Sequence, residues 1–121
     1  MAGKLISNVT ESYNVWLGKS ILIVEDVVSN YSYLEATLKR SGVQITWVKS
    51  GEEAVEVIES GAKFDLVLMD VQLSGMDGYH VTGLIKKKYP QLPIIAQTAY
   101  AMIGEKEKSL LAGCDDYLSK P

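Results

Sequence analysis

The chain has 121 residues, of which 47% are hydrophobic and 22% charged, and its formal net charge is −3. This length and composition are typical of one globular domain, and the absence of net positive charge argues against nucleic-acid binding by this chain. A single cysteine excludes an internal disulfide, and because the sequence has neither an apolar segment long enough to span a membrane nor a signal-peptide core, we expect a cytoplasmic location and no membrane contact.

Residues 1–18 lack a sustained hydrophobic period, so we predict a linker or N-terminal extension there and a folded domain over residues 19–121. The end of this extension, Val15–Leu17, is too apolar for a pure tether. We therefore expect it to pack against this domain or a neighbouring one.

Short apolar runs alternate with amphipathic segments along the rest of the chain. The apolar or alternating runs predict five strands, at 21–24, 44–48, 66–69, 93–97 and 116–118. Apolar residues at helical spacing predict four helices, at 29–41, 50–61, 79–89 and 104–112. We expect a Ser/Asn cap on the first helix and Ser50 at the start of the second. Strands alternating with helices through short connections predict an α/β fold with a doubly wound parallel sheet.

Acidic residues follow two of the predicted strands directly. Glu25 and Asp26 come after the strand at 21–24, and Asp70 comes after the strand at 66–69. The carboxyl ends of parallel strands meet at one edge of the sheet, so these carboxylates should gather there with Thr98 and Lys120. Clustered carboxylates repel one another, and a hard divalent cation with oxygen ligands relieves that repulsion. The sequence therefore predicts an acidic pocket that suits Mg²⁺.

Carboxylates, a hydroxyl and an ammonium around one cation suit phosphoryl transfer to oxygen. The metal can neutralise the phosphoryl oxygens on one side and Lys120 on the other, with Asp70 at the centre as the nucleophile. Gly75 and Gly78 allow the loop after Asp70 to turn closely around the site, which makes the backbone carbonyl of Gln72 a further candidate ligand.

Four ordered motifs resemble those of response-regulator receiver domains. They read Ile-Leu-Ile-Val-Glu-Asp at 21–26, Leu-Val-Leu-Met-Asp at 66–70 with Met-Asp-Gly at 76–78, Ile-Ile-Ala-Gln-Thr-Ala at 94–99, and Gly-Cys-Asp-Asp-Tyr-Leu-Ser-Lys-Pro at 113–121. The resemblance covers residues 19–121 and implies a flavodoxin-like five-stranded sheet in the order 2-1-3-4-5. Asn30 and the preceding Tyr-Asn-x-Trp segment at 13–16 are similar to the corresponding residues of receivers that are fused to hybrid sensor histidine kinases. Such a receiver can be the cytoplasmic part of a membrane-bound sensor kinase.

The resemblance implies a metal-dependent phosphoacceptor that promotes only its own phosphorylation and dephosphorylation and is not an enzyme in its own right. Asp70 would take the phosphoryl group from a histidine kinase or phosphotransfer domain. The metal, Mg²⁺ or Mn²⁺, would be held by Glu25, Asp26, Asp70 and the carbonyl of Gln72, with Asp26 and Asp70 as direct ligands.

The resemblance also implies residues that respond to the phosphoryl group. Thr98 would be the switch hydroxyl, Lys120 the salt-bridge partner, and Tyr117 the aromatic side chain that follows the threonine. Gln72 and Tyr100 would tune the lifetime of the phosphoryl group. The peptide between Lys120 and Pro121 would be cis, a geometry that proline makes accessible.

The chain departs from the family pattern in two places. Ser74 stands where receivers usually have proline, and we expect it to loosen the loop after Asp70. The chain also stops at Pro121, where the family continues through a final amphipathic helix of about a dozen residues. Without that helix, apolar surface beside the first and last strands should be exposed and should support a homodimer or domain swap, unless Val15–Leu17 covers it.

The sequence disfavours two other functions of the same architecture. An aspartyl-phosphate phosphatase would need a second aspartate where the chain has Gln72, and a flavodoxin-like electron carrier would need a hydroxyl-rich loop where it has residues 25–28. A pseudo-receiver that binds partners without phosphorylation is a third alternative, which is disfavoured because the full set of acidic residues, threonine and lysine is present. For Trp47, a core position and an interface position are both open.

Overall fold

The computed structural model describes residues 14–98 and 104–120. Its strands form one parallel sheet in the order β2-β1-β3-β4-β5. The strands are β1 (Ser20–Val24), β2 (Gln44–Val48), β3 (Leu66–Asp70), β4 (Ile94–Thr98) and β5 (Asp116–Ser119). The predicted fold class and strand order are confirmed.

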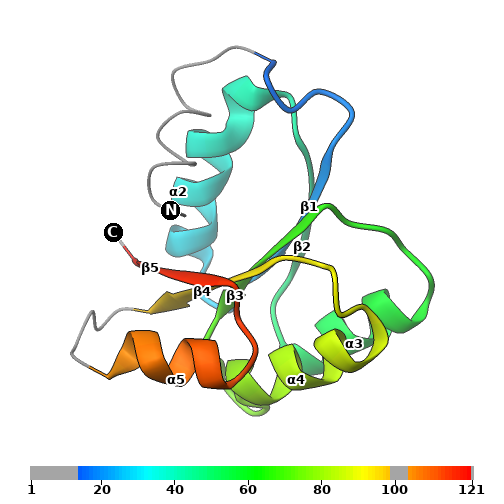
Figure 1. The fold of residues 1–121 in the computed structure, drawn as a ribbon. Helices are drawn as coiled ribbons and strands as arrows, with labels where there is room; N and C mark the ends of the chain where they lie inside the picture. Colours follow the sequence, from blue (N-terminus) through cyan, green and yellow to red (C-terminus); the bar gives the residue numbers. More distant parts are fainter. Residues whose placement is uncertain (1–13, 99–103, 121) are drawn as a thin grey trace.

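Helices cover both faces of this sheet. They are α2 (Val28–Leu38), which continues into the 3₁₀ turn η1 (Lys39–Ser41), α3 (Gly51–Glu59), α4 (Gly78–Lys88) and α5 (Glu105–Leu111). Figure 1 shows α2 on one face of the sheet and α3, α4 and α5 on the other, which gives three layers. Within the described part of the chain, no helix is both long and apolar enough to cross a membrane.

The buried side chains form one cluster on each face of the sheet. On the α2 face, Ile21 and Ile23 of β1 pack with Leu34 and Leu38 of α2. On the opposite face the cluster joins alternate strand residues to α3 and α4, including Leu22, Val24, Val67, Met69, Ala54, Ile58, Val81 and Ile85. Successive strand residues point to opposite faces, so a strand covered on both sides must be apolar throughout. This explains the unbroken apolar runs of β1 and β3.

The start of α2 corrects one expectation. The helix begins at Val28 after the N-cap Val27, and no side chain caps it, so Ser29 does not have the predicted capping role. The N–H of Val27 instead donates to Oε2 of Glu25 at 3.1 Å. The Glu25 carboxylate, which precedes the helix, thus accepts a hydrogen bond from the main chain of the N-cap residue. At α3 the predicted cap is confirmed, because Ser50 Oγ accepts from the N–H of Glu53.

Residues 14–18 form turns beside the connection between α2 and β2. The N–H of Trp16 donates to the Ser41 carbonyl at 2.8 Å, and the Trp16 ring packs against the cluster on the α2 face. Val15 and Leu17 are exposed. Of this segment, Trp16 therefore makes the expected packing contact with the domain. The domain boundary at residue 18 stays a prediction.

Candidate functional site

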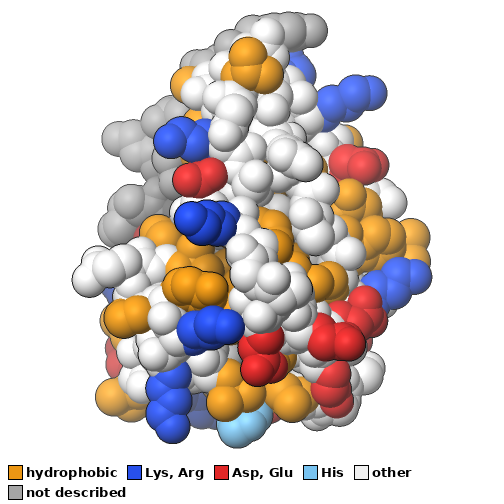
Figure 2. Space-filling model, turned by 90° about the vertical axis from the view of Figure 1, so that its right-hand side faces the viewer, with side chains coloured by type: hydrophobic (Ala, Val, Ile, Leu, Met, Phe, Trp, Pro, Cys, Tyr) orange, Lys and Arg blue, Asp and Glu red, His pale blue; other side chains and the backbone are white. Residues whose placement is uncertain are grey.

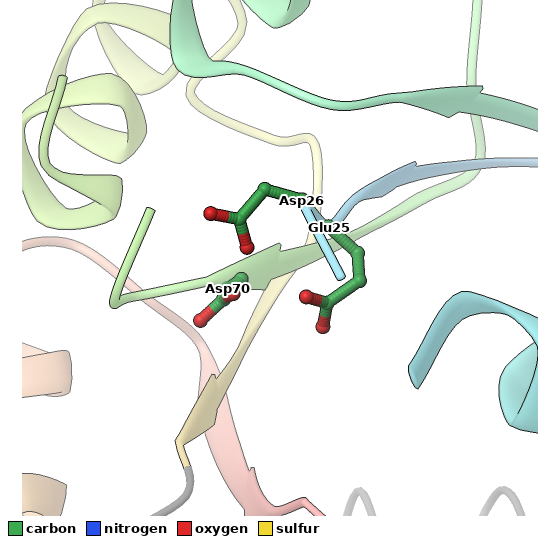
Figure 3. A group of neighbouring side chains, drawn as sticks. All are labelled: Glu25, Asp26 and Asp70. Atoms are coloured by element: carbon green, nitrogen blue, oxygen red, sulfur yellow. The ribbon is translucent and has the colours of Figure 1, made fainter. Parts of the chain in front are cut away.

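Three carboxylates meet at the carboxyl ends of two neighbouring strands. Glu25 and Asp26 follow β1, Asp70 ends β3, and one oxygen from each side chain lies within 4.8 Å of the others. Figure 3 shows the three side chains grouped around the end of β3. Glu25 and Asp70 are fully buried and Asp26 is half-buried. The structure thus brings together the acidic residues that the strand pattern predicted.

Lys120 supplies positive charge from the end of β5. Its Nζ lies 2.8 Å from Oδ2 of Asp70 and 3.2 Å from Oε1 of Glu25. All three side chains are almost entirely buried, so bulk solvent and salt screen these ion pairs weakly. The main-chain N–H of Lys120 also donates to the Thr98 carbonyl at 2.7 Å, which fixes the end of β4 beside the same cluster.

Burial and the neighbouring charges shift the pKa values of two of these groups, Glu25 and Lys120. Burial raises the pKa of Glu25, and although the Val27 N–H opposes this, the charge of Asp70 raises it further. Burial alone would lower the pKa of Lys120, but its hydrogen bond to Asp70 and the charges of Asp70 and Glu25 raise it above the ordinary lysine value. Lys120 is therefore cationic at neutral pH.

The donor set fits a hard divalent cation. Its groups are carboxylate oxygens, which Mg²⁺ prefers as ligands. Three carboxylates against one ammonium leave two formal negative charges in a largely buried cluster, and a divalent ion would balance them.

The loop after Asp70 is hydrogen-bonded to the acidic cluster. The N–H of Gln72 donates to Oδ1 of Asp70 at 2.9 Å. The hydroxyl and the N–H of Ser74 both donate to Oδ2 of Asp26, at 2.9 and 3.2 Å. Serine thus supplies two donors that proline lacks and that tie the loop to Asp26, whereas the expected loosening of the loop stays a prediction. Burial raises the pKa of Asp26, but the two Ser74 bonds, together with the main chain of Asp26 and the charge of Lys120, hold that pKa below its usual value.

Gly78 lets α4 begin directly against the site. A Cβ atom at this position would overlap the Asp70 carbonyl and lie 2.8 Å from Cα of Val71, and neither backbone atom can yield easily. Gly75 adopts a φ of +82°, a left-handed conformation that glycine tolerates. The predicted close turn of this loop is confirmed at both glycines.

The other predicted residues lie around this centre. Thr98 is buried at the end of β4, Tyr117 of β5 is half-buried and packs on the face of α3 and α4, and the Gln72 side chain is exposed. Tyr100 and Pro121 lie outside the described residues, and so does the peptide predicted to be cis.

Sequence reasoning missed the contact between Trp47 and the acidic pair. The indole N–H of Trp47 donates to the Glu25 carbonyl at 2.8 Å. A tryptophan near the end of a strand that neighbours β1 was the available signal. Its direction toward the site depends on the β1–β2 register, in which Ile23 pairs with Trp47.

A comparison with known families identifies the class of protein that this fold and site define. Residues 21–121 match the response regulator receiver domain. The chain belongs to this family and is a receiver domain of two-component signalling.

Individual relatives extend this assignment. The sensor protein GacS of Pseudomonas syringae pv. syringae is 42% identical over 106 residues, which cover 84% of this chain but 12% of GacS. The receiver domain of the sensor histidine kinase PA1611 from Pseudomonas aeruginosa PAO1, solved with a magnesium ion coordinated in its active-site cleft, has a TM-score of 0.78 at 42% identity over 86% of each chain. A chain in the co-crystal structure of the Saccharomyces cerevisiae histidine phosphotransfer protein Ypd1 with the receiver domain of Ssk1 has a TM-score of 0.76 at 32% identity, covering 85% of this chain and 79% of that one.

Proposed function

We propose that Asp70 accepts a phosphoryl group from a phosphohistidine in a Mg²⁺-dependent reaction. The observation that carries this proposal is the position of the Asp70 carboxylate, with the Lys120 ammonium 2.8 Å away and the carboxylates of Glu25 and Asp26 beside it. In the transfer, an Asp70 oxygen attacks phosphorus, the P–N bond to the histidine breaks, and the leaving imidazole takes up a proton. The product is an aspartyl phosphate.

The residues around Asp70 prepare it for this attack. The N–H of Gln72 and the ammonium of Lys120 hold its two oxygens in fixed directions. Mg²⁺, or Mn²⁺, would be held by Glu25, Asp26, Asp70 and the backbone carbonyl of Gln72. The bound ion would neutralise the negative charge of the phosphoryl oxygens. Lys120 supplies positive charge on the other side of the carboxylate.

Phosphorylation then changes the face formed by β4, α5 and β5. Thr98 would move its hydroxyl onto the phosphoryl group, and Tyr117 would follow it. The main-chain bond between Lys120 and Thr98 supports this coupling, because it joins the ends of β4 and β5 next to Asp70. Gln72 and Tyr100 would tune the phosphoryl lifetime, and the exposed Gln72 side chain stands two residues from Asp70.

The phosphoryl donor would be a histidine kinase or a phosphotransfer domain, and the domain would promote only its own phosphorylation and dephosphorylation. The parent protein would be a hybrid sensor kinase, and the match to 12% of the sensor protein GacS supports a longer sensor protein. A cytoplasmic location for this part stays a prediction from the sequence. The co-crystal structure of Ypd1 with a receiver domain supports a phosphotransfer partner. The net charge of −3 supports the expectation that the chain itself does not bind nucleic acid.

Homodimer formation remains a further prediction. A groove of about 550 Å³ lies at the amino ends of the strands, with Trp16, Ile21, Val43, Leu66 and Ile95 among its lining residues. The molecule viewed from the right of Figure 1 exposes hydrophobic side chains between charged ones (Figure 2). Sizing over a range of protein concentrations tests this prediction, and a concentration-independent monomer would contradict it.

Intact-mass measurement after incubation with acetyl phosphate and Mg²⁺ tests the proposed function. We expect the parent to gain one phosphoryl group and Asp70→Asn to gain none. Asp65→Asn is the matched control, because Asp65 lies just before β3, at its other end, and asparagine can still accept from the Ser20 N–H. The absence of an adduct on the folded parent would support the pseudo-receiver alternative instead.

A further inference from the structure

We propose that Trp47 is a positioning residue for the acidic pair, holding the main chain of Glu25 so that Glu25 and Asp26 face Asp70. The consequence for Mg²⁺ rests on the proposed function, whereas the hydrogen bond itself does not. Trp47 belongs to none of the motifs by which the family was identified.

The Trp47 indole N–H replaces a main-chain hydrogen bond at the point where the pairing of β1 and β2 ends. The N–H of Glu25 donates to the Val48 carbonyl at 3.1 Å, which continues the parallel ladder between β1 and β2. In a continued ladder, the Glu25 carbonyl would accept a main-chain N–H from the neighbouring strand. However, β2 ends at Val48 and the chain turns into α3. The Trp47 indole N–H reaches the Glu25 carbonyl instead, at 2.8 Å.

This hydrogen bond fixes the peptide that joins the two acidic residues. The Glu25 carbonyl belongs to the same planar peptide unit as the N–H of Asp26. The next residue is held as well, because the Val27 N–H donates to Oε2 of Glu25. Three hydrogen bonds thus define the path of the chain where it leaves β1. The directions of the Glu25 and Asp26 side chains follow from that path.

Stacking on α2 holds the Trp47 ring in place. The rings of Tyr31 and Trp47 are parallel within 1°, with centroids 3.9 Å apart. Tyr31 is itself oriented, because its hydroxyl donates to Oε2 of Glu35 at 3.1 Å. Lys49 Nζ lies 5.0 Å from the Trp47 ring centroid, within the range of a cation–π contact. Trp47 therefore connects the end of β2, the acidic loop and the first turns of α2.

A purely structural role for Trp47 makes a different prediction. If the ring only fills space, Trp47→Phe should lower stability and leave the Mg²⁺ affinity unchanged. If the indole N–H positions the acidic pair, the same variant should weaken Mg²⁺ binding, because phenylalanine keeps an aromatic ring but has no donor.

Calorimetric titration with MgCl₂ separates these roles. We expect Trp47→Phe to bind Mg²⁺ about tenfold more weakly than the parent, as is usual when an outer-shell partner of a metal ligand is removed. Tyr31→Leu should give a smaller loss in the same direction. Trp16→Phe and Tyr33→Leu are the matched controls and should bind as the parent does. Trp16 lines the groove at the amino ends of the strands, and Tyr33 is exposed on α2.

The outcomes distinguish this inference from the proposed function. Unchanged affinity in Trp47→Phe, with a parent that binds Mg²⁺, would overturn the positioning role alone. A folded parent that binds no Mg²⁺ would instead contradict the metal dependence of the proposed function.

Hydrogen exchange at the indole provides a second test that needs no change at Trp47. The chain has two tryptophans, so Trp16→Phe leaves one indole N–H signal in a ¹H–¹⁵N spectrum. We expect that signal to be protected from exchange and to shift when Mg²⁺ is added. Exchange at the rate of a free indole would overturn the hydrogen bond to Glu25 and with it the proposal, even if Trp47→Phe did not fold.

Discussion

Lys120 and Asp70 are 50 positions apart in the sequence, yet the Lys120 ammonium lies 2.8 Å from Oδ2 of Asp70. The same ammonium is 3.2 Å from Oε1 of Glu25, so one cation serves two buried carboxylates. Because Lys120 follows β5 and Asp70 ends β3, this ion pair connects the edge of the sheet to its centre. It also sets the resting charge of the site that a phosphoryl group would enter.

Replacing Lys120 should destabilise the metal-free protein strongly. Lys120→Gln leaves two buried carboxylates without a counter-charge, and removal of one partner from a buried pair costs about 3–5 kcal/mol. Urea unfolding in the presence of a chelator measures this loss, and added Mg²⁺ should recover part of it.

The control for this variant is Lys86→Gln. Lys86 pairs with Asp115 at 2.7 Å, but the Asp115 side chain is 49% exposed, so this change should cost at most about 1 kcal/mol. Equal losses in the two variants would show that the Lys120 cluster is no more important than a surface ion pair.

The sequence was sufficient to predict the sheet and the acidic centre. Residues 21–24 of β1 and 66–69 of β3 are all apolar because both faces of these strands are covered. Parallel strands bring the acidic residues at their carboxyl ends to one edge of the sheet. The contacts that orient those acids were not predictable. Ser74 reaches Asp26 across 48 positions, and the Trp47 indole reaches the Glu25 carbonyl across 22. The first contact depends on the path of the loop after Asp70 and the second on the β1–β2 register, and no local pattern encodes either.

The start of α2 was also predicted incorrectly from local sequence. Ser29 was a reasonable cap by residue type, since serine favours the N-cap. The N-cap is instead Val27, two residues earlier, and its N–H donates to the buried Glu25 carboxylate. A tertiary constraint on Glu25 thus displaced a local preference.

Ser74→Ala should raise the pKa of Asp26 toward the ordinary aspartate value. The variant removes the hydroxyl donor at 2.9 Å, and a hydrogen bond to the charged form of an acid favours that form. The measurement is an NMR titration of the Asp26 carboxyl carbon in the metal-free protein. Ser60→Ala is the control, because the Ser60 hydroxyl donates to the Val57 carbonyl at the end of α3. An Asp26 titration that is unchanged or shifted downward would contradict the role given to Ser74.

The raised pKa of Glu25 should make the stability of the metal-free protein fall with rising pH. The folded state holds the Glu25 proton more tightly than the unfolded state does, so this contribution is fully present below the ordinary value of 4.5. It is lost as the pH rises through the pKa of the folded state. Asp26, whose pKa is lowered from 3.8, is ionised throughout this window and adds no slope.

Glu25→Gln isolates this effect, because glutamine cannot titrate. The test is urea unfolding of parent and variant in chelator at a series of pH values from 4.5 to neutrality. We expect a flatter stability profile in the variant. Parallel profiles would mean that Glu25 has the same pKa in the folded and unfolded states.

Two glycines of α4 should respond to alanine in opposite directions. Gly78→Ala places a methyl group against the backbone of Asp70 and Val71, and we expect a loss of about 3 kcal/mol or more. Gly83→Ala meets no atom within 4 Å and lies within the helix, so it should gain about 1 kcal/mol. Thermal unfolding of both variants measures the two effects. A Gly78→Ala variant as stable as the parent, or more stable, would contradict the close approach of α4 to the site.

The most direct test of the account is to identify which carboxylate carries the phosphoryl group. After incubation with acetyl phosphate, borohydride reduction converts an acyl phosphate to an alcohol, and peptide mass mapping then locates it. We predict a single modified residue, Asp70, formed only when Mg²⁺ is present. Modification of Glu25 or Asp26 in its place, or the same yield at Asp70 in excess chelator, would contradict the central claim.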